Sequence, residues 1–427
     1  MRERAKNAAL AGLFVLMIFL LYLSLTLGIE REDGLLARVF GTAETGEEVT
    51  LQPRSAIELR TLAVCTPNGV RMPENTGEKE EMQSAVSAIY AEAVGSAGEA
   101  QVITRRQYLE LFRTPAVYFG FDAELPLFLL RAWVGFDGGE RDSRLRGLVV
   151  AADGEQVSVA WYDTAAGQYC MSPTAAGVDR LTQACSLWNE SNAVFAFQDA
   201  DFAALCADEP VLLRAGAETK YSVLPPAFAE AGELSRELLA GFGLNPYLAR
   251  VYAEAAGDRV YVENYNALGY NALRMSAKGE LTYTAGAAGQ GISLGLSEEE
   301  TGDWSLLVEG VRALLSNLNA QAGASGTYSL SEIVQEQNGE LTLLFDLTLG
   351  GYAVVAERPA AHAVVQNGQV VYLRMSPVRC EASETQSILP ARQAVAALRG
   401  GHHLRLNVRY MEKENGVLTP VLCSAEE

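Results

Sequence analysis

The sequence predicts an α+β fold, in which a single N-terminal transmembrane helix precedes extracytoplasmic domains of antiparallel sheets with helices packed on one face. Three observations predict this fold class. An uncharged apolar run opens the chain, segments with helical periodicity alternate with strand-like segments beyond it, and three Asn-Gly dipeptides lie between pairs of strand-like segments. Helices followed by paired strands are typical of α+β domains, whose sheets use one face for the helices and leave the other free for a partner.

The opening apolar run is a predicted membrane span. It extends from Ala8 to Leu27 without a charged residue, and as a helix it is about 30 Å long, which matches the hydrocarbon core of a bilayer. The basic residues before it are Arg2, Arg4 and Lys6. The positive-inside rule therefore places the N-terminus in the cytoplasm and the rest of the chain outside. A cleaved signal peptide is the alternative, but SLTLGIERED lacks a small-residue cleavage site, so we expect residues 1–29 to remain as a cytoplasmic tail and anchor.

The span also carries candidate residues for contact with a second membrane helix. Ala8 and Gly12 form a small-xxx-small pair that allows close approach of a helix. Ser24 and Thr26 offer hydroxyl groups for hydrogen bonds across such an interface. An ordinary anchor with incidental small residues is the alternative. Past the span, residues 30–53 are rich in Gly, Glu and Thr and are expected to form a stalk.

The charge and the cysteines of the chain limit its partners. A formal net charge of −20 at pH 7 excludes binding to nucleic acid or to an anionic surface by charge. Six cysteines follow the span: Cys65, Cys170, Cys185, Cys206, Cys380 and Cys423. None has the spacing of a metal site. Pairing of Cys380 with Cys423 and buried free thiols are both open alternatives.

Residues 54–216 are expected to form the first exported domain. Its first helix, EKEEMQSAVSAIYAEAV, ends at Gly95, and its apolar residues at helical spacing are Met82, Val86, Ile89 and Ala93. Thr104 and Gln107 form a predicted capping box at the start of a second helix. AVYFGFD is typical of a strand, and the alternating runs around Asp153-Gly154 predict a hairpin that is followed by a third strand, GQYCM.

After this domain, a pattern of one helix followed by antiparallel strands recurs three times. The predicted helices are ELSRELLAGFG, WSLLVEGVRALLSNL and ARQAVAAL. An Asn-Gly pair supplies the two positive φ angles of a tight type I′ hairpin, and these pairs are Asn338-Gly339, Asn367-Gly368 and Asn415-Gly416. We expect two further domains, a middle helix-plus-strands domain at residues 217–300 and a C-terminal helix-plus-hairpins domain at residues 301–427.

The segment YNALGYNAL repeats nearly the same five residues. Residues five apart lie on opposite faces of a strand, so the duplication predicts two strand ends joined by a bend at Gly269 instead of a repeated recognition motif. In RVYVENY we expect the valines to be buried, which turns Tyr261 and Tyr265 outward as candidate interface residues. Leu273 and Met275 then return to the core. The alternative is that the tyrosines cover another domain of the same chain.

The strongest catalytic candidate is Ser293 in GISLG, which matches the G-x-S-x-G nucleophile elbow. A serine hydrolase also needs a base, and the histidines of the chain are His362, His402 and His403. GISLG follows a glycine-rich loop instead of a buried strand. The adjacent His402 and His403 point to opposite faces of a strand, so neither an acyl hydrolase nor a histidine metal pair is expected.

No cofactor-binding or metal-ligating set is predicted. The glycines around residue 290 do not fit the dinucleotide-binding pattern, and no Walker lysine accompanies them. Glu298, Glu299 and Glu300 are expected to start a helix, where the N-terminal dipole favours carboxylates, and not to bind a cation.

Four longer segments together resemble the YycH/YycI (WalH/WalI) family. They are NPYLARVYAEAAGDRVYVENYNALGYNALRMSAKGELTY, VYFGFDAELPLFLLRAWVG, AHAVVQNGQVVYLRM and LRLNVRYMEKENGVLTPVL, all behind a single N-terminal span. This family comprises membrane-anchored accessory proteins of the YycG (WalK) sensor histidine kinase of Gram-positive bacteria. The resemblance implies an extracytoplasmic regulator of a two-component system that has no enzymatic activity. It also implies association with the kinase and with a second YycH/YycI-type membrane protein, partly through transmembrane helices.

A kinase-regulating interaction protein in the cell membrane is therefore the expected function. An exported ligand-binding or cell-wall-associated module is the first alternative, and a serine acyl hydrolase that uses Ser293 is the second. Gene neighbourhood distinguishes them, because the gene of a regulator should lie beside those of a response regulator and a sensor kinase.

Overall fold

The computed structural model describes residues 59–425 with internal gaps. The residues outside the description are 1–58, 75, 137–142, 201, 203–209, 214–216, 255–256, 265–269, 287–290, 336–338, 388–404, 413–415 and 426–427. The predicted span with Ala8, Gly12, Ser24 and Thr26, the candidate Tyr265 and the third recurring helix therefore fall outside the described residues. Within the described part, no helix combines the length and the apolar character that a membrane crossing requires. The described residues belong to one compact unit, Pro53–Glu427.

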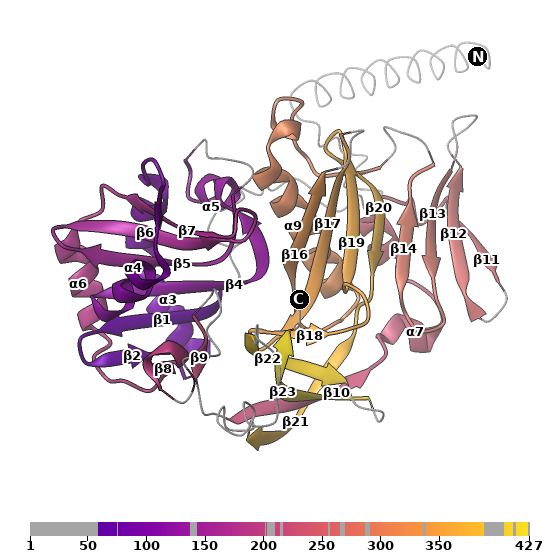
Figure 1. Cartoon of the computed structure of the whole chain (residues 1–427). Coiled ribbons are helices and arrows are strands. Elements are labelled where there is room, and N and C mark those ends of the chain that lie inside the picture. The colour runs from indigo at the N-terminus through magenta and orange to yellow at the C-terminus, as the bar shows by residue number, and fades with distance from the viewer. Residues whose placement is uncertain are drawn as a thin grey trace, which may run out of the picture. The chain divides into compact units, whose positions relative to one another are not determined.

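The first part of this unit forms a seven-stranded antiparallel sheet with the order β2-β1-β4-β5-β6-β7-β3 (Figure 1). Its strands are β1 (Leu59–Thr66), β2 (Gly69–Arg71), β3 (Gln101–Ile103), β4 (Ala116–Pro126), β5 (Arg144–Asp153), β6 (Gln156–Asp163) and β7 (Gln168–Pro173). The predicted hairpin around Asp153-Gly154 is confirmed, because the β5–β6 ladder runs to the pair Asp153 and Gln156, and Gly154 has a φ of 65°. The predicted third strand is β7, which pairs with β6.

Helices cover both faces of this sheet, whereas the sequence predicted helices on one face. On one face, Leu62 and Val64 of β1 share a core with the helices α3, α5 and α6. On the other face, Ala63 and Cys65 pack with Tyr108 of α4 and with residues of η2. Because both faces are buried, the later part of β5, GLVVAA, is a continuous apolar run and does not alternate. These helices are α3 (Thr76–Gly95), α4 (Arg105–Glu110), η2 (Leu111–Arg113), α5 (Leu127–Trp133) and α6 (Val178–Ser186).

The local signals of this region are confirmed in detail. The four apolar residues of the first predicted helix are all buried in α3, and α3 ends at Gly95 as predicted. At the start of α4, the Thr104 side chain accepts the N–H of Gln107 at 3.3 Å, and the Gln107 side chain accepts the N–H of Thr104 at 2.9 Å. This is the predicted capping box. A small two-stranded sheet of β8 (Val194–Phe195) and β9 (Leu212–Leu213), with η3 (Ala196–Gln198), follows.

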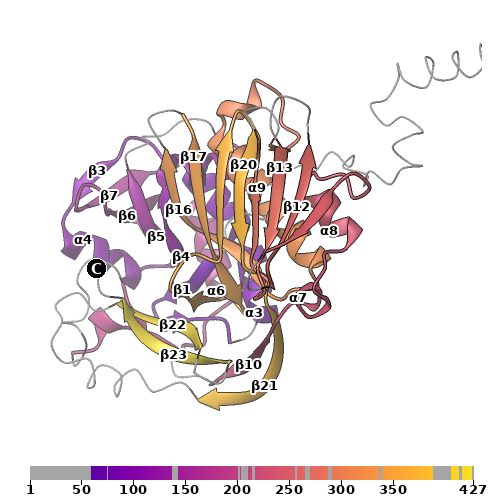
Figure 2. The ribbon, with the colours of Figure 1, turned by 90° about the vertical axis from the view of Figure 1, so that its right-hand side faces the viewer.

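The rest of the described chain builds a fourteen-stranded sheet with the order β11-β12-β13-β14-β20-β19-β17-β18-β22-β23-β10-β21. In addition, β15 pairs with β20 and β16 pairs with β17. Figure 2 shows β10, β21, β22 and β23 together at the lower end of this sheet. β14 pairs with β20 and β10 pairs with β21, so the predicted ranges 217–300 and 301–427 share one sheet.

The strands of the large sheet are β10 (Ala217–Leu224), β11 (Arg250–Ala253), β12 (Arg259–Asn264), β13 (Tyr270–Met275), β14 (Leu281–Thr284), β15 (Ile292–Ser293), β16 (Thr327–Gln335), β17 (Leu341–Leu349), β18 (Tyr352–Val355), β19 (Ala361–Gln366), β20 (Gln369–Met375), β21 (Arg379–Ser387), β22 (Arg405–Glu412) and β23 (Val417–Ala425). β18 pairs with β22 in parallel, and the other ladders of this sheet among the described residues are antiparallel. The associated helices are α7 (Ala227–Ala231), α8 (Arg236–Gly241), η7 (Glu300–Gly302) and α9 (Trp304–Gln321).

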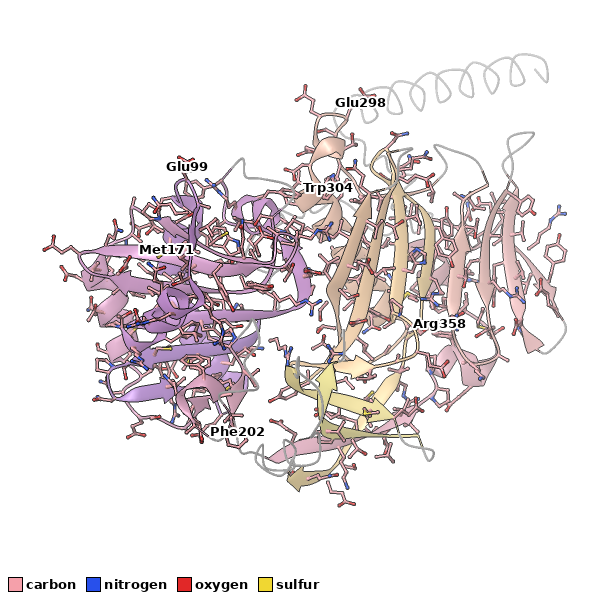
Figure 3. The ribbon with its side chains drawn as sticks, in the orientation of Figure 1. Glu99, Met171, Phe202, Glu298, Trp304 and Arg358 are labelled. Carbon is pink, nitrogen blue, oxygen red and sulfur yellow. The ribbon has the colours of Figure 1, made fainter. Side chains whose placement is uncertain are left out.

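The helix α9 covers one face of the large sheet, as predicted. Its residues Val311, Leu315 and Leu318 are buried in the same core as Leu373 of β20 and Tyr283 of β14. Leu273 and Met275 are also buried in this core, as expected from the sequence. In Figure 3, Trp304 marks the start of α9.

The predicted helix start at Glu298, Glu299 and Glu300 leads into the short 3-10 helix η7 and not directly into α9. The short helix η7 begins at Glu300, and α9 starts only after it. Asp303 is the N-cap of α9, because its Oδ1 accepts the N–H of Ser305 at 2.8 Å. The Asp303 carboxylate thus satisfies one of the unpaired N–H groups at the start of α9. The glutamates lie before this position and do not cap α9.

The Asn-Gly hairpin prediction is confirmed at the turn that is fully described. Asn367 and Gly368 have φ angles of 51° and 71°, and they join β19 to β20 between the paired residues Gln366 and Gln369. Two positive φ angles are those of a type I′ turn. At the other two turns the asparagines lie outside the described residues, while the flanking strands pair antiparallel as expected.

Glu309 of α9 is a buried carboxylate whose ionisation opposes folding. Arg312 donates to its Oε2 at 2.9 Å, but its Oε1 has no hydrogen-bond partner. Burial raises the pKa of Glu309, and Arg312 opposes this rise without cancelling it. A raised folded-state pKa means that stability is lost as the pH rises from the unfolded value of about 4.3 through the folded value.

We therefore expect Glu309→Gln to raise the melting temperature of the purified chain at pH 7 and to have a much smaller effect near pH 4, where the carboxyl is mostly protonated in both states. Thermal unfolding across this pH range measures the difference. Glu332→Gln at an exposed position of β16 is the control and should change neither curve. The explanation is contradicted if the stability gained by Glu309→Gln over the unaltered chain is smaller at pH 7 than at pH 4.

Candidate interaction surface

The face of the large sheet opposite α9 carries a stripe of uncharged side chains. The strand registers align one residue from each of seven strands, and these residues form the open-face stripe: Val262, Ala272, Thr284, Tyr372, Val364, Thr342 and Val334. Each is exposed or partly exposed, so the described helices leave this face open. In a chain with a formal net charge of −20, an uncharged stripe across seven strands is a candidate protein-binding surface.

The next row of residues along the same face contains charged and polar side chains together with Val260 and Leu344. It contains Arg274 of β13, Arg374 of β20 and His362 of β19, which the registers bring to the same face. The His362 ring lies 5.1 Å from the Tyr372 ring, centroid to centroid. Burial, with a smaller contribution from Arg374, lowers the pKa of His362, so this histidine is neutral at pH 7. An uncharged stripe with charged residues beside it is compatible with the composition of protein interfaces.

At one end of the sheet, the exposed apolar side chains gather around β11. Of the ten large apolar side chains that are exposed in the described residues, five lie between residues 247 and 270, each with 50–65% of its surface accessible. These five form the β11 edge surface: Tyr247, Leu248, Val251, Tyr252 and Tyr270. β11 is the outer strand of the sheet order and lies at the right-hand edge in Figure 1. All four of its residues are exposed.

A hydrogen-bonded turn fixes the side chains that precede β11. The buried carboxylate of Glu263 on β12 accepts the N–H of Asn245 at 2.7 Å. The Asn245 side chain in turn accepts the N–H of Tyr247 at 3.0 Å. The guanidinium of Arg236 lies 5.2 Å from the centre of the Tyr247 ring. Tyr247 is therefore held in position although its ring is exposed.

An ion-pair network fixes the hairpin of β11 and β12. Arg274 of β13 donates to Glu254 at 2.8 Å and to Asp258 at 2.9 Å. Hydrogen bonds from the backbone N–H of Ala277 and from Arg274 lower the pKa of Asp258. The hairpin closes with a bond from the Glu254 N–H to the Asp258 carbonyl at 2.9 Å. The edge strand is thus tied to the sheet at both of its ends.

The predicted orientation of Tyr261 is wrong. Tyr261 is only 3% exposed, and its hydroxyl accepts the N–H of Leu234 at 2.9 Å, while Val260 and Val262 lie on the open face. Alternation along RVYV defines two faces but does not say which of them the helices cover. The tyrosine occupies the covered face because its ring fills the core and its hydroxyl satisfies a backbone donor near α8. Tyr261 is therefore a packing residue.

The structure also places the candidate nucleophile Ser293 far from the candidate base His362. Ser293 belongs to the two-residue strand β15, and its Oγ accepts the N–H of Gly295 at 3.1 Å. Its ladder partner on β20 is Gln369, whereas His362 pairs with Arg374 of the same strand. Five residues along a strand correspond to about 16 Å, so His362 does not reach Ser293. His402 and His403 lie outside the described residues.

Among the cysteines whose side chains are described, none forms a disulfide bond. These cysteines are Cys65, Cys170, Cys185 and Cys380. Burial raises the pKa of Cys185 to about 12 and that of Cys380 to about 11. These two thiols are therefore protonated at neutral pH and unreactive. The side chain of Cys423 lies outside the described residues, so its pairing with Cys380 stays a prediction.

The sequence reasoning missed the β11 edge surface. It identified LARVYAEAAGDRVYVEN as paired strands, but strand pairing within a hairpin does not reveal which strand lies at the end of the sheet. The sequence carries no signal for this surface, because the exposure of RVYA and of the Tyr247-Leu248 pair follows from the order of the strands in the sheet.

Comparisons with known proteins give one structural similarity. No family model matches the chain, and no curated protein matches it. The crystal structure of YycH from Bacillus subtilis is similar to the chain with a TM-score of 0.46 and 9% sequence identity. The alignment covers 87% of this chain and 96% of that one.

Proposed function

We propose that the chain is a non-enzymatic, membrane-anchored, extracytoplasmic regulator that modulates a two-component sensor histidine kinase of a Gram-positive bacterium through transmembrane and ectodomain contacts. The predicted span is the anchor and a contact helix, and the open-face stripe is the ectodomain contact for the kinase. A second YycH/YycI-type membrane protein is the further partner that the sequence resemblance implies.

The open-face stripe is the observation that carries this proposal. An antiparallel sheet with one solvated face normally alternates apolar and polar residues, with polar side chains on the solvated face. Here that face presents Val, Ala, Thr and Tyr side chains in line across seven strands. The covered face already has its helix, so the stripe is available to a partner and not needed for the core of the described chain. Co-purification of the intact chain from membranes with the neighbouring sensor kinase tests the proposal.

A charge in the centre of the stripe should weaken kinase binding. We expect Val364→Lys to reduce binding by roughly 1–3 kcal/mol, because an unpaired ammonium would lose its hydration in the interface. His362→Lys adds the same group to the same strand outside the stripe and is the matched control. The free energy of unfolding of both variants should lie within about 0.5 kcal/mol of that of the unaltered chain, since both sites are on the surface. Equal co-purification of the kinase with both variants contradicts the assignment of the stripe.

The predicted span should contribute to the same regulation. We expect Ala8→Leu combined with Gly12→Leu to abolish regulation while leaving the amount of membrane-anchored protein unchanged, because bulky side chains block close helix approach. Leu10→Phe adds bulk on the opposite side of the helix and is the control. Ser24→Ala combined with Thr26→Ala tests the hydroxyl groups separately. If regulation persists in both double variants, the span serves only as a membrane anchor and makes no regulatory helix contact.

A further inference from the structure

We propose that two copies of this chain pair through their β11 strands, in antiparallel orientation around a two-fold axis at Tyr252, so that the large sheet continues from one copy into the other. This inference goes beyond the proposed function. It concerns the β11 edge surface and leaves the open-face stripe of both copies uncovered, since strand pairing extends a sheet within its own plane.

The backbone of β11 has hydrogen-bonding groups that point away from the sheet. In an antiparallel ladder, the N–H and C=O of one residue point to the same side, and neighbouring residues alternate. The Glu254 N–H donates to the Asp258 carbonyl, so the backbone N–H and C=O groups of Glu254, Tyr252 and Arg250 point toward β12. The backbone groups of Val251 and Ala253 therefore point away from β12, to the side where no described strand pairs with β11. A second strand can bond to these two residues.

The side chains of β11 select one register for a second copy. A two-fold axis at Tyr252 aligns Val251 with the partner's Ala253, which joins outward-pointing groups on both strands. The same register places Arg250 opposite the partner's Glu254, twice per dimer. An axis at Val251 would instead place Arg250 opposite the partner's Tyr252, and an axis at Ala253 would place Tyr252 opposite the partner's Glu254. Opposite charges across a strand pair favour the first register.

In the register with the axis at Tyr252, Glu254 and Tyr252 are both accessible to the second copy. Glu254 already accepts Arg274 at 2.8 Å, and its side chain is 43% exposed, so it remains accessible to the arginine of a second copy. The two Tyr252 residues form a pair that is not hydrogen-bonded, in which Cα atoms are about 4.5 Å apart and side chains are closest. Both rings are exposed in the single chain and bury each other in the dimer.

The edge lacks three of the features that keep edge strands unpaired, although it is short. β11 contains no proline and no lysine, and its register with β12 has no bulge. Arg250 of β11 and Glu254, which follows the strand, have opposite charges and lie at equal distance from Tyr252 in sequence. This charge pattern is complementary to itself when two copies run antiparallel, and self-complementarity is the property of an isologous interface. A strand with a different charge pattern would bring like charges together.

Disulfide trapping of the full-length chain in detergent tests the register. We expect Tyr252→Cys to form a disulfide-linked dimer under mild oxidation, because the paired Cα atoms lie within the range of about 4.4–6.8 Å that a disulfide requires. Val251→Cys is the control, since the two copies of this residue are more than about 7 Å apart in the proposed register. The unaltered chain sets the background from the native cysteines. Equal trapping at both positions, or none at Tyr252→Cys, overturns the proposal.

Charge reversal provides an independent test in sedimentation experiments. Arg250→Glu places two glutamates opposite each other at both ends of the pair, and we expect about a tenfold weaker dimer. Combining Arg250→Glu with Glu254→Arg restores opposite charges and should restore dimerisation. A double variant that stays as weak as the single variant, or an unaltered chain that sediments as a monomer, overturns the proposal. Neither result depends on whether the chain binds a kinase.

Discussion

Replacing Tyr261 with serine should lower the free energy of unfolding by about 3–5 kcal/mol, the cost of deleting a buried aromatic side chain. The Tyr261 ring is 3% exposed and belongs to the core that α9 covers. Its hydroxyl also accepts the N–H of Leu234, a backbone donor that would lose its partner. The loss is thus a cavity combined with an unsatisfied polar group. Denaturant unfolding of the purified chain measures it.

Two further variants separate these contributions. Tyr261→Phe keeps the ring and removes the hydroxyl, so it should cost about 1–3 kcal/mol through the unpaired Leu234 N–H. Tyr270→Ser changes an exposed tyrosine on the neighbouring strand β13, outside the proposed pairing strand, and should cost no more than about 0.5 kcal/mol. If Tyr261→Ser were as stable as Tyr270→Ser, Tyr261 would lie on the surface as the sequence alone predicted.

Gly326→Ala should destabilise the chain by about 2–5 kcal/mol, because two costs add at this position. Gly326 follows α9 and precedes β16, and its φ is 82°, in the region that L-residues avoid. A Cβ atom there would lie 2.7 Å from the carbonyl oxygen of Thr348 on β17, a backbone atom that cannot turn away. Asn319 of α9 also donates to the Gly326 carbonyl at 3.0 Å, which fixes the turn.

Gly323 is the matched control for this prediction. It lies in the same connection with a φ of 62°, but a Cβ atom there meets nothing within 4 Å. Gly323→Ala should therefore cost only the backbone term of about 1–2 kcal/mol. Equal losses of stability at the two glycines would mean that the close approach to Thr348 does not contribute.

The sequence predicted best the features that a few neighbouring residues determine. The helix α3 and its end at Gly95, the capping box of Thr104 and Gln107, and the Asn367-Gly368 turn all depend on contacts within about one helical turn or one hairpin. Helix periodicity and turn chemistry act over such distances, so these predictions did not depend on the rest of the fold.

The features that the sequence did not predict depend on contacts between distant segments. The join of β14 to β20 pairs residues about ninety positions apart, and the pairing of β10 with β21 spans a still longer part of the chain. The cover on the second face of the N-terminal sheet comes from α4 and η2, which local periodicity does not place. The position of β11 at the edge follows from the same non-local order.

Tyr261 shows what strand alternation does and does not predict. The alternation of RVYV correctly predicts two faces, but the apolar character of the valines does not predict which face is buried. The helices decide the assignment instead, since they cover the face that carries Tyr261, Leu273 and Tyr283. The valines, which suit either face of a pleated sheet, lie on the open one and begin the stripe.

The most direct measurement for the proposed function is the phosphorylated fraction of the response regulator in cells that carry the intact gene, lack it, or carry the Val364→Lys variant. A regulator that acts through the open-face stripe predicts that loss of the gene shifts this fraction, that the intact gene restores it, and that the Val364→Lys variant behaves like the deletion although its protein is present in the membrane. An unchanged phosphorylated fraction in cells that lack the gene would contradict the account.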